Sequence, residues 1–144
     1  MIKTYRKALV VALVVGTAGL AVASTALATS ATGTQNPDLT VTASLASNGA
    51  NPDQATNGDQ VTARYSVTNN TAQRRRVAIK YTLQYPDGQT VTRSQKLTLA
   101  PGQTDADSFT YTVVSSFPRG TYDLTVSARD ANGTSSATAS ITLY

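Results

Sequence analysis

The stretch Pro118-Arg-Gly-Thr-Tyr-Asp-Leu-Thr-Val-Ser-Ala-Arg-Asp-Ala-Asn-Gly-Thr134 decides the fold class of this chain. From Tyr122 to Ala128, apolar side chains alternate with polar ones. A two-residue period is typical of a strand with one buried face and one wet face. The Pro/Gly pair before it and Asn132-Gly133 after it are turn residues, and the second pair favours a hairpin. The stretch therefore predicts a half-buried strand that is followed by a tight turn.

The same period recurs through most of the chain. Six further segments show it, around residues 39–45, 61–67, 77–85, 91–99, 109–113 and 137–143. Short strands at spacings of about 10 to 15 residues are typical of a sandwich. We therefore predict an all-β, immunoglobulin-like antiparallel sandwich of about seven strands. The segment at 91–99 carries Arg93 and Lys96, and such charges mark an edge strand.

Three glycines are predicted to make turns between these strands. Gly88 ends Pro86-Asp87-Gly88, where it supplies the positive φ of a three-residue hairpin loop. Gly102 follows Pro101 in the pattern of a type II turn. Gly133 follows Asn132 in the predicted hairpin.

The first 28 residues have the layout of a secretory signal peptide. Three cations precede an apolar run over 8–23, and Ala26-Leu27-Ala28 then supplies an A-x-A cleavage site. We predict cleavage after Ala28 and a secreted, extracellular protein. A weaker cleavage site lies at Ala21-Val22-Ala23, and an uncleaved segment would be the only membrane contact, as a tilted anchor over 8–28. Residues 29–37 are small and polar and are predicted to be a flexible leader, so the sandwich domain is assigned to 38–144.

Charge and composition exclude several function classes. Without the first 28 residues, three of the twelve Lys and Arg are lost and all eight Asp remain, so the formal charge falls from +4 to +1. Net charge then gives no support for nucleic-acid binding. The chain has no His and no Cys, so it lacks the usual zinc ligands and the usual nucleophile–base pairs. We predict no enzyme activity, no cofactor and no disulfide.

Asp105 and Asp107 are the candidates for a metal site. Calcium takes oxygen ligands, and two Asp at i, i+2 share one face of a strand. They do not form a dense D-x-D-x-D loop, and Asp is also an ordinary turn residue. The pair is thus a weak calcium candidate, and a calcium-stiffened stalk is one hypothesis for the chain.

The triplet Arg74-Arg75-Arg76 forms, with Lys80, the one basic cluster of the sequence. If Val77 and Ile79 point inward, then Arg74, Arg76 and Lys80 line the outer face of the sheet. Such a face is suited to an anionic glycan, polymer or protein patch. The plainer interpretation is that solvated charges discourage edge pairing.

Three segments carry a resemblance to a known family. Val61-Thr-Ala-Arg-Tyr-Ser-Val-Thr-Asn-Asn70, Leu99-Ala-Pro-Gly-Gln103 and Gly120-Thr-Tyr122 with Asp130-Ala-Asn-Gly133 are similar to bacterial extracellular immunoglobulin-like modules, of the CARDB type and related to fibronectin type III. The likeness covers roughly residues 38–144 and concerns the fold rather than a ligand. It places Tyr122 at the tyrosine corner of such sandwiches, where its hydroxyl bonds upstream backbone.

Together these features predict a secreted, non-catalytic binding or structural module that acts at the cell exterior. Its binding surfaces would be the loops at 48–60 and 115–120 or the basic outer strand face. Its partner would be an extracellular protein or an anionic glycan or polymer. The alternative is an inhibitor of an extracellular protease that uses the end loops.

Overall fold

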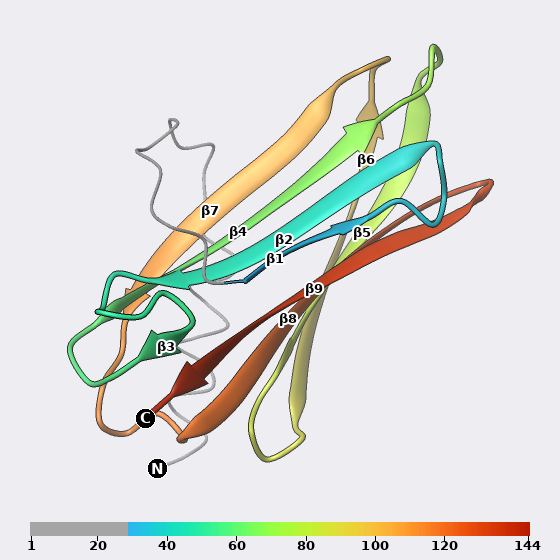
Figure 1. Cartoon of the computed structure of the whole chain (residues 1–144). Helices are drawn as coiled ribbons and strands as arrows, with labels where there is room; N and C mark the ends of the chain where they lie inside the picture. The colour runs from blue at the N-terminus through green and yellow to red at the C-terminus, as the bar shows by residue number, and fades with distance from the viewer. Residues whose placement is uncertain (1–28) are drawn as a thin grey trace.

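The computed structural model describes residues 29–144, and within them every regular element is a strand (Figure 1). One sheet has the order β1-β2-β4-β7 and the other the order β3-β9-β8-β5-β6. The bounds are β1 Thr29–Gly33, β2 Leu39–Ser47, β3 Gln54–Ala55, β4 Gln60–Asn69, β5 Arg75–Gln84, β6 Thr90–Leu99, β7 Thr104–Thr112, β8 Gly120–Asp130 and β9 Gly133–Leu143. The prediction of an all-β immunoglobulin-like sandwich is confirmed. The predicted signal peptide lies outside the described residues, and residues 29–144 contain no helix that could span a membrane.

The flexible leader predicted for 29–37 is wrong. Thr29–Gly33 is strand β1, which pairs antiparallel with β2 from Thr29 opposite Leu45 to Gly33 opposite Val41. An edge strand needs backbone partners on only one side, so a short run without a strong apolar period suffices. Gln35 then exchanges two hydrogen bonds with the backbone of Ser136, at 3.0 and 3.3 Å. Residues 29–33 therefore belong to the sandwich rather than to a leader.

The loop predicted between residues 48 and 60 contains a second strand that the sequence did not indicate. Gln54 and Ala55 form β3, which runs parallel to the end of β9. Ala55 is fully buried, and the amide of Tyr144 donates to its carbonyl at 2.9 Å. A pair of residues is too short to show any period, so only the tertiary pairing reveals this strand.

The two sheets are closest where β1 and β2 face β8 and β9. Small side chains such as Ala43 and Ala139 are buried on this side. Toward β4 and β5 the space between the sheets is filled by aromatic rings, and the ring centres of Tyr65 and Tyr81 lie 4.6 Å apart. Because interiors pack to a nearly constant density, the gradient in side-chain size sets how far the sheets diverge.

The turn residues take the conformations that their sequence patterns require. Gly102 has a φ of 70°, and the amide of Gln103 donates to the carbonyl of Ala100 across the turn at 3.0 Å. Gly88 has a φ of 80° and Gly133 one of 152°. The β8–β9 hairpin turns one residue earlier than expected, because Asp130 pairs with Gly133.

Tyr122 is buried at the start of β8, with 1 % of its surface exposed. Its hydroxyl donates to the carbonyl of Pro118 at 2.8 Å, four residues upstream. This is the contact of a tyrosine corner, and it ties the β7–β8 connection to the core.

Candidate functional site: a basic outer sheet face

The predicted basic cluster is divided by the pleat of β5. Val77 and Ile79 are buried, so Arg76 and Lys80 lie on the outer face of the five-stranded sheet and are exposed. Arg74 precedes the strand and is exposed in the connection from β4. Arg75 has the inward parity of Val77, so its assignment to a binding surface is wrong.

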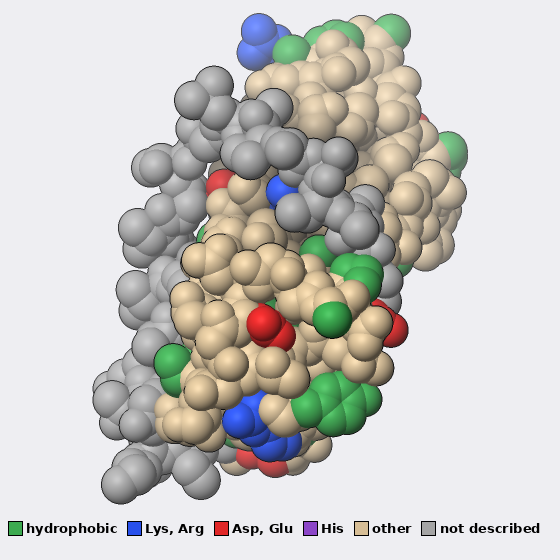
Figure 2. Space-filling model, turned by 60° about the vertical axis from the view of Figure 1, so that its left-hand side comes forward, with side chains coloured by type: hydrophobic (Ala, Val, Ile, Leu, Met, Phe, Trp, Pro, Cys, Tyr) green, Lys and Arg blue, Asp and Glu red, His purple; other side chains and the backbone are tan. Residues whose placement is uncertain are grey.

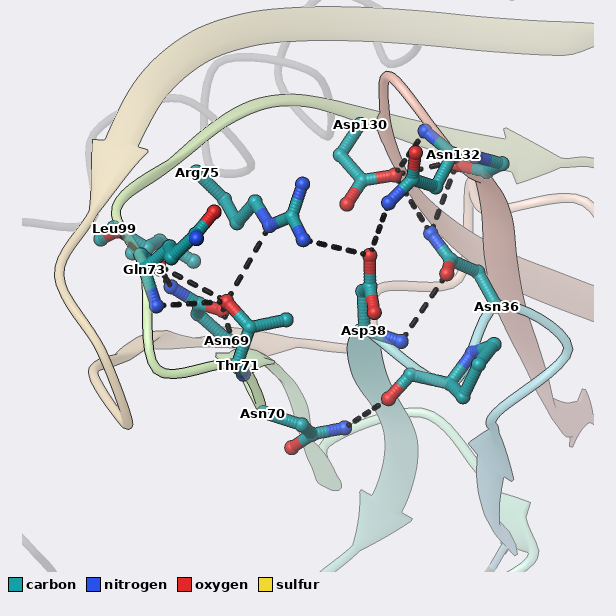
Figure 3. A network of polar contacts seen from close by, with 12 residues as sticks. Asn36, Asp38, Asn69, Asn70, Thr71, Gln73, Arg75, Leu99, Asp130 and Asn132 are labelled. Carbon is teal, nitrogen blue, oxygen red and sulfur yellow. Dashed lines mark hydrogen bonds and ion pairs between the residues drawn. The ribbon is translucent and has the colours of Figure 1, made fainter.

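Arg75 belongs to a polar network at one end of the sandwich (Figure 3). Its guanidinium lies 3.2 Å from the carboxylate of Asp38, and both side chains are largely buried. Asn132 donates to the same carboxylate at 2.6 Å. The network joins the β1–β2, β4–β5 and β8–β9 connections, so Arg75 stabilises the fold and is not free to bind a ligand.

Asp130 is the buried carboxylate of this network, with 7 % of its surface exposed. Its Oδ1 accepts hydrogen bonds from the side chain of Asn36 at 2.8 Å and from the amide of Asn132 at 2.8 Å. Burial by itself would raise the pKa of Asp130. The two hydrogen bonds, a third from the Gly133 amide and the positive charge of Arg75 have the opposite effect. Their sum is larger, so the pKa of Asp130 is lowered.

We expect Asp130→Asn to lower the free energy of unfolding by about 1–3 kcal/mol at neutral pH, because the amide cannot replace the ionised acceptor. A lowered native pKa stabilises the fold above the unfolded value near 4, and this stabilisation disappears as pH falls through the native pKa. The difference in the free energy of unfolding between wild type and Asp130→Asn should therefore become smaller as the pH falls. Urea unfolding from pH 7 to pH 2.5 measures it. Asp123→Asn on the outer face makes the same charge change as a control, and a difference that stays constant with pH would contradict the assignment.

The structure adds two cations to Arg76 and Lys80. Ala78 of β5 lies opposite Lys96 of β6 on one side and opposite Arg129 of β8 on the other. Arg76, Lys80, Lys96 and Arg129 thus surround Ala78, and we call these four residues the cation ring. Neighbours in the ring are diagonal cross-strand pairs, with side chains about 7 Å apart at Cβ.

All four side chains of the cation ring are exposed. Within residues 29–144 none of them makes a hydrogen bond or an ion pair. The carboxylate that shares their face on β8, that of Asp123, lies six residues from Arg129, or about 20 Å along the strand. The ring is therefore a local concentration of positive charge on a domain that is close to neutral.

Edge protection explains only one member of the ring. Lys96 lies on β6, which ends the five-stranded sheet, as the sequence predicted for this segment. Arg76 and Lys80 lie on β5, between β8 and β6, and Arg129 lies on β8, between β9 and β5. Interior strands have no free edge, so these three cations have no role in preventing edge pairing.

A groove of about 460 Å³ is lined by three of the four ring cations, Arg76, Lys96 and Arg129, and Lys80 lies outside its lining. It is lined by residues 76–78 of β5, residues 96–98 of β6, and Arg129 and Asp130 of β8. The small side chain of Ala78 thus lies among the long side chains of Arg76, Lys96 and Arg129. The face of the molecule in Figure 2 shows no such concentration of charge. It consists mostly of uncharged polar side chains and backbone, and its charged side chains are spread over several positions.

Asp105 and Asp107, the weak calcium candidates, point between the sheets from β7. Asp105 accepts hydrogen bonds from the hydroxyl of Tyr65 and the amide of Gln95, both at 3.3 Å. Residues 29–144 contain no group of three or more acidic, His or Cys side chains that is suited to a metal ion. Since β7 is the last strand of its sheet, inward carboxylates have a plain structural role, because they disfavour pairing with another chain.

Three tyrosines with raised pKa values lead us to predict that the domain loses stability at alkaline pH. Burial raises the pKa of Tyr65, Tyr81 and Tyr111, and the nearby carboxylates add to this for the first two. The native state therefore keeps protons that the unfolded chain releases above about pH 10, so stability falls as pH rises beyond that value. Urea unfolding from pH 8 to pH 11.5 should show this fall.

The variant Tyr65→Phe/Tyr81→Phe should reduce the alkaline loss of stability, and Tyr144→Phe is the control because Tyr144 is 59 % exposed. Equal pH dependence in wild type and both variants would exclude the buried tyrosines as its cause.

The two loops proposed as binding surfaces lie side by side. The amide of Gly58 donates to the carbonyl of Val113, and the amide of Val113 donates to the carbonyl of Asp59, both at 2.8 Å. Next to them, Val114 is 40 % exposed and Tyr144 is 59 % exposed. The sequence showed two separate loops, whereas the fold makes one composite surface of them.

Sequence reasoning missed Lys96 and Arg129 as partners of the basic cluster. Both have the outward parity of their strands, so their orientation was predictable. Their position beside Ala78 depends on strand order and register, which a single sequence does not contain.

Solved structures similar to this chain include an alkylpurine DNA glycosylase, AlkC, of Pseudomonas fluorescens, at 13 % identity over 64 % of this chain and 28 % of that chain, with a TM-score of 0.45. The C-terminal domain of wzt is 13 % identical over 71 % of this chain and 70 % of that chain, with a TM-score of 0.48. A family 123 glycoside hydrolase of Clostridium perfringens is 8 % identical over 72 % of this chain and 27 % of that chain, with a TM-score of 0.46. The chain thus spans about a quarter of two of these proteins. A search of curated proteins finds no match.

A family model gives a more specific result. The CARDB model matches residues 36–138, which include all strands except β1 and the end of β9. CARDB domains are bacterial immunoglobulin-like β-sandwiches, non-catalytic and found in extracellular proteins. The likeness suggested by the turn and core residues is confirmed, and this chain belongs to the CARDB family.

Proposed function

We propose that this protein is a secreted, non-catalytic binding module that attaches to an anionic partner at the cell exterior through the cation ring. The observation that carries the proposal is the set of four exposed, unpaired cations around Ala78, three of them on interior strands. Like charges this close repel each other and do not stabilise the free domain. An anionic partner would relieve that repulsion.

The test is co-sedimentation of the exported protein with the envelope fraction of the cells that secrete it. Wild type should bind at low salt and be released by added salt, because contacts between exposed charges are screened. The variant Arg76→Ala/Lys80→Ala/Lys96→Ala/Arg129→Ala should lose binding. A double variant, Arg64→Ala/Arg93→Ala, lowers the charge away from the ring and should keep it. Full binding by the quadruple variant would refute the proposal.

A second function, inhibition of an extracellular protease by the end loops at 48–60 and 115–120, is favoured by the contact between these two parts of the chain. Two hydrogen bonds join Gly58 and Asp59 of the first loop to Val113, just before the second, and the next residue, Val114, supplies an exposed apolar side chain. Rigid loops on a sandwich frame are suited to insertion in a cleft. Titration of serine and cysteine proteases with the exported protein is the test, and unchanged rates at micromolar protein would exclude this function.

A further inference from the structure

The geometry of the cation ring points to the chemical class of its partner. We infer that the ring binds a phosphodiester-linked polymer of small polyols, an inference that rests on the proposed function. Four features of the ring carry it: the pairing of its cations, the neighbouring hydroxyl groups, the uncharged lining and the absence of aromatic side chains.

The cations are arranged to share oxyanions between strands. Arg76 and Arg129 form one side of the ring, and Lys80 and Lys96 form the opposite side. The two cations of each side stand on neighbouring strands, about 7 Å apart at Cβ, so an anion between them faces donors from two directions. A phosphodiester has two free oxygens in a tetrahedral arrangement and can bridge them. A planar carboxylate instead chelates a single guanidinium.

Hydroxyl groups complete the donor set. Thr98 lies opposite Arg76, while Ser94 and Ser127 lie opposite Lys80 on either side. None of these three side chains makes a hydrogen bond within residues 29–144. Hydroxyl groups beside cations are common donors to phosphate oxygens.

The centre of the groove is neutral. Val77, Ala78 and Leu97 supply uncharged lining between the cations, and the carboxylate of Asp130, which also lines the groove, accepts hydrogen bonds from Asn36 and Asn132. The uncharged linker between two phosphates would lie there, while its anionic ends reach the cations. An anion placed over this uncharged lining would lie away from the cations, so a linker that is itself uncharged fits there best.

Within residues 29–144, the strands β5, β6 and β8 direct no aromatic side chain to this face. Tyr81 and Tyr122, the tyrosines of β5 and β8, point to the interior. Single-stranded nucleic acids gain much of their affinity by stacking bases on exposed rings. The ring therefore favours a polyol linker over a nucleoside.

The probe is poly(glycerol phosphate), compared with poly-L-glutamate and single-stranded DNA of similar length, each titrated against the exported protein at several salt concentrations. We expect poly(glycerol phosphate) to bind at least about tenfold more tightly than either competitor. If each of four cations releases about 0.7 counterion, a fourfold rise in salt should weaken binding about 50-fold.

The variant Lys96→Ala/Arg129→Ala should reduce this salt effect to about sevenfold, since two contacts remain. The variant Arg64→Ala/Arg93→Ala should leave it near 50-fold, and circular dichroism and urea unfolding verify that both variants fold. Because all ring positions are exposed, their loss should not affect folding.

The possible outcomes separate the inference from the proposed function. If poly-L-glutamate or DNA binds at least as tightly as poly(glycerol phosphate) and Lys96→Ala/Arg129→Ala weakens that binding, the ring is an anion site but the inference is overturned. If no polymer binds, or if Lys96→Ala/Arg129→Ala binds like wild type, both the inference and the proposed function are overturned.

Discussion

Replacing Asn69 with alanine should lower the free energy of unfolding by about 3 kcal/mol, the largest loss expected for an uncharged polar side chain of this domain. Asn69 ends β4 with none of its surface exposed. Its amide donates to the carbonyls of Gln73, Leu99 and Ala100 at 2.8, 3.1 and 3.0 Å (Figure 3). Its carbonyl oxygen accepts from the amide and hydroxyl of Thr71 at 3.0 and 2.8 Å.

The loss is large because alanine removes five hydrogen bonds at once from a fully buried position. Each typical hydrogen bond contributes about 0.5–1.5 kcal/mol net, and the carbonyls of Gln73 and Ala100 keep a second donor, so we expect a total near 3 kcal/mol. For a domain of this size, 3 kcal/mol corresponds to a fall in Tm of about 12 °C. Thermal and urea unfolding measure the change.

Asn70→Ala is the matched control, because the side chain of Asn70 is exposed and its amide donates to the carbonyl of Pro37 and the hydroxyl of Thr40. We expect a loss of less than about 1 kcal/mol there. Equal losses in the two variants, or a loss under about 1 kcal/mol for Asn69→Ala, would show that the three carbonyl contacts are not important for stability.

Gly33→Ala should be the second large effect, at about 2–3 kcal/mol. A Cβ at this position would lie 1.9 Å from the backbone oxygen of Ser136, so β1 and β9 cannot keep their present distance. Gly33 does not have a positive φ, so alanine by itself would stabilise the chain by about 0.4–1 kcal/mol through the unfolded state. The steric term is larger because the clashing atom is backbone and cannot rotate away.

Hydrogen exchange distinguishes local from global damage in this variant. Displacement of β1 should remove protection from the amides that pair β1 with β2, between residues 29–33 and 41–45. Thr32→Ala is the control, since Thr32 is exposed on the same strand. Wild-type protection and stability in Gly33→Ala would mean that residues 29–33 are not held against β9 and that the leader predicted from the sequence is the better description.

The strands that the sequence predicted correctly share one property, a buried face opposite a solvated one. In β5 and β8 this produces an alternation that a single sequence displays directly. β1 and β3 lack the alternation because one is a short edge strand and the other has two residues. Their stability comes from backbone pairing and from contacts such as that of Gln35 with Ser136, which no local pattern records.

The basic surface also combines a feature that the sequence displays with features that only the fold creates. The sequence displayed three consecutive arginines, but the pleat turns Arg75 inward to Asp38 while Arg76 stays outside. In the cation ring, Lys96 comes from β6, which follows β5 directly through a hairpin, whereas Arg129 comes from β8, which is distant in the chain. Proximity across a sheet depends on register, which is a property of the assembled strands.

By itself, the sequence determined the all-β class, the inward and outward side of most strands and the turns at Gly88 and Gly102, because these depend on neighbouring residues. Only the tertiary structure decided that residues 29–33 belong to a sheet, that Arg75 is a structural ion-pair partner and that four cations surround Ala78. These features arise between strands, where pairing and packing place residues that the chain keeps far apart.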